Sequence, residues 1–197
     1  IQQCEVCQRY KNEHVSSPGL LQPLQIPNST WRHISMDFVE KLPMSDGADT
    51  VLVVIDRLSK YGHFIPLKHP FNAEEVANVF LDNIFKLHGL PDTIVCDRDK
   101  VFTSRFWTSI LEKLGVQINF TSAYHPQSDG QTERLNQCLE AYLRCFSGDK
   151  PNSWKHWLAM AEYWYNTSFQ SSAGVTPHEV LYGVKPVPLN LGLLHDM

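Results

Sequence analysis

The sequence predicts an α/β fold in which one five-stranded mixed β-sheet is flanked by helices. Two observations predict this class. Strand-like and helix-like stretches follow one another in the order β-β-β-α-β-α-β-α-α, and 43% of the 197 residues are hydrophobic. A chain of this length and composition can form one domain with a proper core and short flanking segments.

Both ends of the chain are expected to lie outside that domain. Residues 1–17 have too few apolar side chains for a core, and residues 18–30 are rich in proline and typical of a linker. We expect the folded domain at residues 31–183 and a tail at residues 184–197. Because the chain begins with Ile1 and shows no signal-like segment, we expect it to be a piece of a longer protein.

Three strands are expected first. Apolar and polar residues alternate from Ile34 to Phe38, and Ser45-Asp46-Gly47 has the composition of a turn. The β-branched run Thr50–Asp56 suits a strand that is buried on both faces. Tyr61–Leu67 follows closely enough to pair with it as the third strand.

A helix is expected over Asn72–His88, because Asn72 and Glu75 have the spacing of a capping box and Gly89 and Pro91 end the pattern. Its predicted buried stripe is Val76, Val79, Phe80, Ile84 and Leu87.

A short strand, Thr93–Cys96, follows that helix, and Asp97 comes directly after the strand. A second helix ends at Gly115, and Val116–Phe120 is expected to be the fifth strand. The apolar stripe of this second helix is predicted to be Phe106, Trp107, Ile110, Leu111 and Leu114.

The last two helices are expected after a loop at Thr121–Gln127. The first begins near Ser128, where Ser128 and Gln131 match a capping box, and the second spans Ser153–Tyr165. The tryptophans of the second helix are typical of a core, although a surface for a second subunit stays an alternative. The buried face of the first helix is predicted to be Leu135, Leu139, Leu143 and Phe146, and the tryptophans are Trp154, Trp157 and Trp164.

Three acidic residues lie at the ends of these elements. Asp37 lies within the first strand, Asp97 follows the fourth, and Glu133 lies in the first turns of the long helix. Three converging carboxylates repel one another unless cations lie between them, and oxygen ligands favour Mg²⁺ or Mn²⁺. Two such ions suit an in-line attack on a phosphodiester. The alternative is that these are solvated acids, which are common at such positions.

Two further acids compete with this set. Asp56 ends the second strand directly before Arg57, so it either pairs with that residue or caps a turn. Asp99 lies two residues after Asp97, in a segment of alternating charges. Composition alone does not choose between Asp97 and Asp99.

Four motifs resemble the integrases of retroviruses and long-terminal-repeat retrotransposons, and most closely the gypsy-type (Ty3-like) branch. Thirty-five residues separate Asp97 from Glu133, and the resemblance covers essentially the whole chain. The motifs are Ser35–Val39 (SMDFV), Val53–Tyr61 (VVIDRLSKY), Ala123–Asn136 (AYHPQSDGQTERLN) and Thr176–Gly183 (TPHEVLYG).

The resemblance implies a ribonuclease-H-like fold and assigns the catalytic and metal-binding roles to Asp37, Asp97 and Glu133, with two Mg²⁺ (or Mn²⁺) ions. It implies 3′-end processing followed by strand transfer, which inserts the element's DNA into target DNA. A domesticated or inactive DNA- or protein-binding relative and a ribonuclease-H-like nuclease remain alternatives. The resemblance also implies multimers and a nuclear site of action, after synthesis as part of a cytoplasmic polyprotein.

The loop and the start of the long helix are expected to contact DNA. Backbone N–H groups at a helix N-terminus favour a phosphate, and a glycine lets a DNA backbone approach closely. Tyr124 either stacks on the DNA or rests on the core. The residues expected to contact DNA are Tyr124, His125, Gln127, Ser128, Gly130, Gln131, Arg134 and Asn136.

Cys4 and Cys7 have the spacing of half a zinc site. The resemblance implies that residues 1–17 are the second half of a His-His-Cys-Cys zinc domain. His14 would supply only a third ligand, so we expect no zinc site in this chain.

The net charge of −4 argues against strong autonomous DNA binding, because proteins that bind DNA through their own surface field are usually basic. No apolar run approaches the ~18 residues that a membrane span needs, so no membrane partner is expected.

Overall fold

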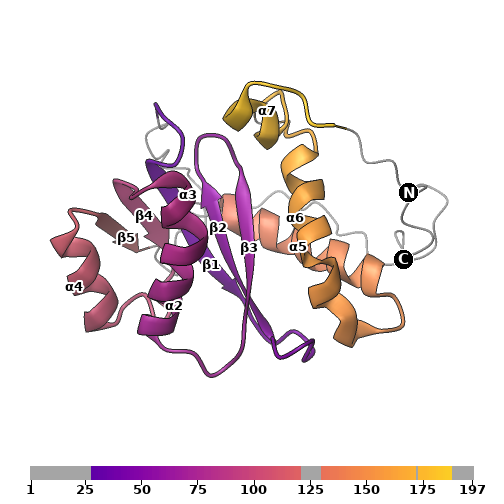
Figure 1. The fold of residues 1–197 in the computed structure, drawn as a ribbon, viewed down its shortest axis with the longest axis horizontal. Helices are drawn as coiled ribbons and strands as arrows, with labels where there is room; N and C mark the ends of the chain where they lie inside the picture. The colour runs from indigo at the N-terminus through magenta and orange to yellow at the C-terminus, as the bar shows by residue number, and fades with distance from the viewer. Residues whose placement is uncertain (1–27, 121–129, 172, 188–197) are drawn as a thin grey trace, which may run out of the picture.

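A computed structural model describes residues 28–120, 130–171 and 173–187, and the side chains of residues 130–134 are not among what it describes. Its centre is one five-stranded sheet with the strand order β3-β2-β1-β4-β5 (Figure 1). The predicted mixed sheet is therefore confirmed. The strands are β1 (His33–Val39), β2 (Thr50–Asp56), β3 (Gly62–Leu67), β4 (Thr93–Cys96) and β5 (Gln117–Phe120).

The sheet is antiparallel on one side of β1 and parallel on the other. β1 pairs antiparallel with β2, and β2 pairs antiparallel with β3, whereas β1–β4 and β4–β5 are parallel. Met36 pairs with Cys96, so the residues that follow them, Asp37 and Asp97, come next along two neighbouring strands. This register brings together two carboxylates that are far apart in the sequence.

Helices cover both faces of the sheet (Figure 1). Leu52 and Val54 of β2 lie in a core with α2 and α4, and Val51 and Val53 lie in a second core with α5 and α6. All of β2 is buried for this reason, as its β-branched sequence predicts. The helical segments are α2 (Ala73–Phe80), η1 (Leu81–Phe85), α3 (Lys86–His88), α4 (Arg105–Lys113), α5 (Gly130–Ser147), η3 (Pro151–Trp157), α6 (Leu158–Thr167) and α7 (Pro177–Tyr182).

The first predicted helix contains a π-helical segment, η1, that its sequence pattern does not reveal. The capping box at Asn72 and Glu75 is confirmed. Leu87 was predicted to be buried, but it is 59% exposed. The π-type bonding of η1 uses more residues per turn than an α-helix, so the inward position moves from Leu87 to His88. The ring of His88 stacks on Trp31 at 3.7 Å.

The predicted buried stripe of α4 is only partly correct. Trp107 and Leu111 are buried, whereas Phe106, Ile110 and Leu114 are exposed. The reason is that α4 lies at the end of the sheet where the edge strand β5 has only four residues. This short strand offers too little surface to cover a wide apolar stripe.

The C-terminal helices also differ in part from the prediction. Leu135, Leu139 and Leu143 are buried as predicted, but Phe146 is 43% exposed and packs on Tyr142. The predicted helix over residues 153–165 is divided into the 3₁₀ helix η3 and the α-helix α6. α7, which was not predicted, begins with a capping box. The three tryptophans of the last predicted helix differ in burial. Trp154 is buried, Trp157 is partly buried and Trp164 is exposed.

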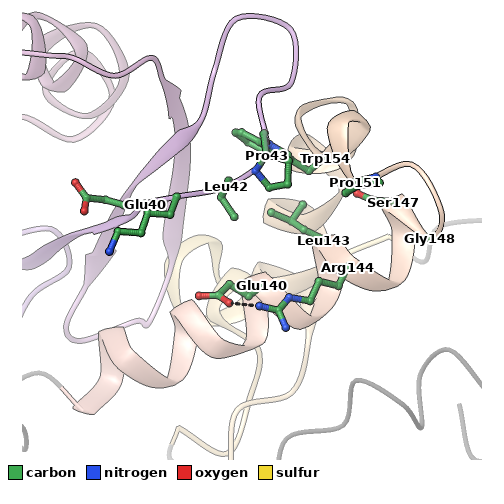
Figure 2. Close-up of a pocket in the computed structure, with 11 residues that line it drawn as sticks. Glu40, Leu42, Pro43, Glu140, Leu143, Arg144, Ser147, Gly148, Pro151 and Trp154 are labelled. Carbon is green, nitrogen blue, oxygen red and sulfur yellow. Dashed lines mark hydrogen bonds and ion pairs between the residues drawn. The ribbon is translucent and has the colours of Figure 1, made fainter.

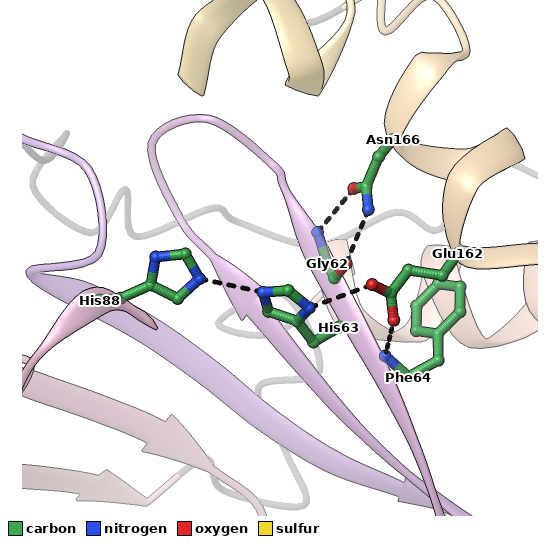
Figure 3. A network of polar contacts seen from close by, with 6 residues as sticks. All are labelled: Gly62, His63, Phe64, His88, Glu162 and Asn166. Carbon is green, nitrogen blue, oxygen red and sulfur yellow. Dashed lines mark hydrogen bonds and ion pairs between the residues drawn. The ribbon is translucent and has the colours of Figure 1, made fainter. Parts of the chain in front are cut away.

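Side chains of α6 form hydrogen bonds with backbone groups on the outer edge of β3 (Figure 3). Asn166 accepts a hydrogen bond from the Gly62 N–H and donates one to the Gly62 carbonyl, both at 2.8 Å. Glu162 accepts from the Phe64 N–H at 2.7 Å and pairs with His63 Nδ1 at 3.1 Å. The edge strand is thereby closed to further strand pairing.

None of the described helices is long and apolar enough to cross a membrane. Residues 1–27 and 188–197 lie outside the described residues, so the linker, the tail, and the roles of Cys4 and Cys7 stay predictions.

Candidate active site

Asp37 lies in the middle of the sheet and faces α5. Its Oδ2 accepts a hydrogen bond from Asn136 Nδ2 at 2.8 Å, and its Oδ1 accepts from the Phe38 N–H at 2.9 Å. The alternation of side chains along β1 sends Asp37 to the same face as Val39, which packs in the core beneath α5. The carboxylate is thus held between a strand and a helix.

Asp97 occupies the neighbouring position at the end of β4. Because β1 and β4 are parallel and Met36 pairs with Cys96, Asp37 within β1 and Asp97 directly after β4 take neighbouring positions on adjacent strands, which are about 4.8 Å apart. Partial burial raises the pKa of Asp97, the Asp99 N–H lowers it, and the nearby Asp99 carboxylate raises it again. Burial and a like charge both disfavour the ionised form, and a bound cation would offset both effects.

Asp99, the rival of Asp97, makes contacts on both sides of it in the segment after β4. Asp99 accepts the Val101 N–H at 2.7 Å and donates its own N–H to Asp97 Oδ1 at 3.0 Å. Its carboxylate therefore closes a turn after β4. Its N–H also supports the carboxylate that continues the strand.

Asp56 also has a structural role. It is fully buried and accepts hydrogen bonds from the Trp31 N–H at 2.9 Å and from the Ser59 N–H at 2.8 Å. Of the alternatives that the sequence left open for Asp56, the turn cap is confirmed.

Glu133 lies in the first turn of α5, three residues before Asn136. Residues three apart on a helix share a face, so position 133 lies one turn from the residue that contacts Asp37. Among the residues whose side chains the structure describes, no three His, Cys, Asp or Glu groups are placed to hold a metal ion. The Glu133 side chain is not one of those described.

The predicted DNA contacts fall mostly outside the described part of the chain. Residues 121–129 are not described, which removes Tyr124, His125, Gln127 and Ser128 from view. The backbone positions of Gly130, Gln131 and Arg134 lie at the start of α5.

Asn136 is the one predicted DNA contact whose side chain is described, and it donates to Asp37. Its Oδ1 is buried and has no hydrogen-bond partner within the described residues. The contact between Asn136 and Asp37 was not predicted from the sequence. The signal that could have found it is the three-residue spacing from Glu133 on the polar face of the helix.

Comparisons with known proteins identify a family and several relatives of the chain. Residues 27–126 match the integrase core domain family. The whole chain is 35% identical to part of the Transposon Tf2-3 polyprotein of Schizosaccharomyces pombe, and it spans 15% of that protein's length. The Transposon Tf2-4 polyprotein of the same organism is similar to the same extent.

Solved structures share the fold. An integrase chain of a simian T-cell lymphotropic virus intasome, in complex with PP2A regulatory subunit B56 gamma, aligns with a TM-score of 0.67 and 20% identity over 94% of this chain and 66% of that one. The HTLV-2 integrase catalytic core domain, in complex with magnesium and in a trimeric form, aligns with a TM-score of 0.60 and 18% identity over 79% of this chain and 97% of that one. The predicted ribonuclease-H-like fold is therefore confirmed.

Proposed function

The chain belongs to the integrase core domain family, and from this premise we propose that it catalyses metal-dependent 3′-end processing and strand transfer of retroelement DNA. The observation that carries the proposal is the placement of the carboxylates. Asp37 within β1 and Asp97 directly after β4 take neighbouring positions on adjacent strands, and Asp37 accepts a hydrogen bond from the α5 residue one turn after Glu133. If Glu133 also reaches this position, three carboxylates from separate elements would repel one another, and divalent cations bound between them would offset that repulsion.

In this proposal, Asp37, Asp97 and Glu133 hold two Mg²⁺ (or Mn²⁺) ions. The donor set fits, because carboxylate oxygens are the ligands that these ions prefer. When bound, the ions make the attacking oxygen more acidic and stabilise the leaving oxygen. Asn136 holds Asp37 Oδ2 in place, and the Asp99 N–H does the same for Asp97 Oδ1.

The substrates are then the ends of the element's DNA and a target duplex. One structural relative is named as part of an intasome and another as a trimeric form, and these names support a homo-oligomer for this chain. The transposon polyprotein relatives support synthesis as part of a polyprotein. Action on chromosomal DNA places the working enzyme in the nucleus.

An assay of DNA resolution on a branched substrate with Mn²⁺ or Mg²⁺ tests the proposal. We expect Asp37→Asn, Asp97→Asn and Glu133→Gln each to abolish activity. The melting temperature of each variant should hold or rise, since each change removes one of three mutually repelling charges.

Asp99→Asn is the matched control. It should keep substantial activity, because an amide oxygen can still accept the Val101 N–H. An active Asp97→Asn beside an inactive Asp99→Asn would refute the assignment. DNA binding without metal-dependent chemistry would indicate an inactive relative, and a preference for cleaving RNA would indicate a nuclease.

A further inference from the structure

A cavity of about 450 Å³ lies between the segment that follows β1 and the C-terminal half of α5 (Figure 2). Leu42, Leu143 and Trp154 give it apolar walls. Trp154 is fixed in place, because its Nε1 donates to the Pro43 carbonyl at 2.6 Å. The volume lies within the range of small-ligand sites and suits one nucleotide better than a stretch of duplex.

Two elements that carry candidate active-site residues, the β1 segment and α5, continue into the lining of the cavity. Glu40 lies three residues after Asp37, and Glu140 lies one turn after Asn136 on α5. At 1.5 Å per residue, Glu140 and Arg144 are about 6 and about 12 Å from Asn136 along the helix. At ~3.4 Å per nucleotide of a stacked strand, these spans correspond to roughly two to four nucleotides.

The polar groups of the cavity are of mixed charge. Lys41 and Arg144 supply cations, Glu40 and Glu140 supply carboxylates, and Arg144 Nη2 pairs with Glu140 Oε2 at 3.0 Å. The hydroxyl of Ser147 is buried and has no partner in the part of the chain that the structure describes. Its residue also lines the cavity, so a polar ligand could satisfy the hydroxyl after a small adjustment.

One ligand class matches this lining better than the others. A nucleobase offers an apolar face to Leu42, which is partly exposed, and exocyclic amino groups to the carboxylates. Its phosphate suits Lys41 and Arg144. A free anion fits less well: the two carboxylates and the C-terminal end of α5 repel it as they repel any phosphate, and it has no base that could offset this repulsion by contact with Leu42. A wholly apolar ligand would remove water from the charged side chains and would offer them no polar contacts in its place.

We propose that this cavity takes one unpaired nucleotide of the DNA strand that is bound at the candidate active site. The proposal depends on the proposed function and adds a requirement to it. The bound strand is unpaired within about two to four nucleotides of the reacting phosphate, at the distance set by α5. Holding that base fixes the position of the strand relative to Asp37.

The test compares an intact branched DNA with an otherwise identical DNA that carries one abasic sugar. Three abasic DNAs are tested in turn, with the abasic sugar at the second, third or fourth nucleotide from the junction. Binding to the full 197-residue chain is measured at low salt in EDTA. We expect one abasic position to weaken binding by about fivefold or more, because an abasic sugar loses the apolar contact that the base makes with Leu42. If all three abasic DNAs bind as tightly as the intact DNA, the proposal is overturned.

Leu42→Trp should fill the cavity and remove the difference between the two DNAs, whereas Leu114→Trp on α4 should keep it. If Leu42→Trp disturbs the fold, Arg144→Gln provides a second variant, because this side chain is exposed. Arg144→Gln should weaken both DNAs by the same factor, and Lys113→Gln should weaken neither. A folded Leu42→Trp that keeps the full abasic effect would also contradict the proposal.

These experiments distinguish an error in the cavity proposal from an error in the proposed function. Mg²⁺-dependent resolution of both DNAs at equal rates, with equal binding, would refute the cavity alone. A chain that neither binds nor resolves either DNA would refute both.

Discussion

The two polar atoms of the Asn136 side chain differ in their hydrogen bonding. Its Nδ2 donates to Asp37 Oδ2 at 2.8 Å, while its Oδ1 is buried without a partner among the described residues. A buried acceptor that lacks a donor costs free energy, so the site gains if a ligand or a water supplies one. The residue thus both orients a candidate metal ligand and offers an acceptor beside it.

Replacing Asn136 with Ala should weaken divalent metal binding. Groups that orient metal ligands typically contribute 10–100-fold in metal affinity, and we expect a loss within about that range. The measurement is the Mg²⁺ concentration that half-saturates the rise in melting temperature. This readout does not depend on catalysis.

Asn78→Ala is the control for that experiment, because Asn78 is an exposed asparagine on α2. The control should leave the Mg²⁺ dependence unchanged. If Asn136→Ala also leaves it unchanged, Asn136 does not orient a metal ligand.

At the scale of elements, a histidine bridge formed by His63, His88 and Glu162 joins β3, α3 and α6 (Figure 3). The two Nε2 atoms are 2.9 Å apart, and the ring centroids are 5.2 Å apart, so the rings meet nearly head-on. That geometry suits one proton shared between two imidazoles. Burial, then the charge of His63, lowers the pKa of His88 to about 4, against a smaller opposing effect of Asp56.

Acid should therefore loosen this bridge. The unfolded chain binds a proton at His88 below about pH 6.5, whereas the folded chain resists it until about pH 4. The stability contributed by neutral His88 is complete above pH 6.5 and is lost as the pH falls toward 4. Melting temperatures measured between pH 7 and pH 4 should show this loss.

His88→Phe tests the assignment, because phenylalanine can keep the stack on Trp31 and cannot titrate. Between pH 6.5 and pH 4, the melting temperature of this variant should fall less than that of the parent chain. His156→Gln, a change at an exposed histidine of η3, should behave like the parent chain. A His88→Phe chain with the full loss between pH 6.5 and 4 would show that other groups cause it.

At the scale of the whole molecule, the net charge of −4 limits what this chain does with DNA alone. Each phosphate contact normally uses a cation, and metals would hold only the reacting phosphate. We expect weak affinity for plain duplex, falling steeply with salt. We also expect resolution of branched DNA without paired insertion of two ends.

A comparison with a chain extended at both ends, using the same DNA and Mn²⁺, measures that limit. The chain spans 15% of the length of the Transposon Tf2-3 polyprotein, and the segments that flank the matching part of that relative can supply the extensions. Efficient two-ended insertion by the 197 residues alone would contradict the expectation.

The amino-terminal cysteines lead to a separate expectation. Cys4 and Cys7 supply two ligands, and a structural zinc site needs four. A chelator should therefore leave the melting temperature of this chain unchanged. A clear drop, together with one zinc per chain by elemental analysis, would reveal a complete site.

The sequence by itself determined the five strands, most of the helices and their order, but not η1 or α7. The strand at Thr50–Asp56 and the cap at Asn72 were predictable because period, β-branching and capping are properties of residues within a few positions of one another. The exposure of Leu87 was not, since a π-helical turn shifts a helix face without a local signal. The resemblance to integrases added the choice of Asp97 over Asp99, which local composition left open.

Only the tertiary structure decided which of these elements meet. Asn136 and Asp37 are 99 residues apart in sequence, and His63 and His88 are 25 apart, yet each pair is within hydrogen-bond distance. Such contacts depend on strand order and on how helices pack across the sheet, which no short window of sequence contains. For the same reason, the cavity beside α5 became visible only once the segment after β1 was placed against that helix.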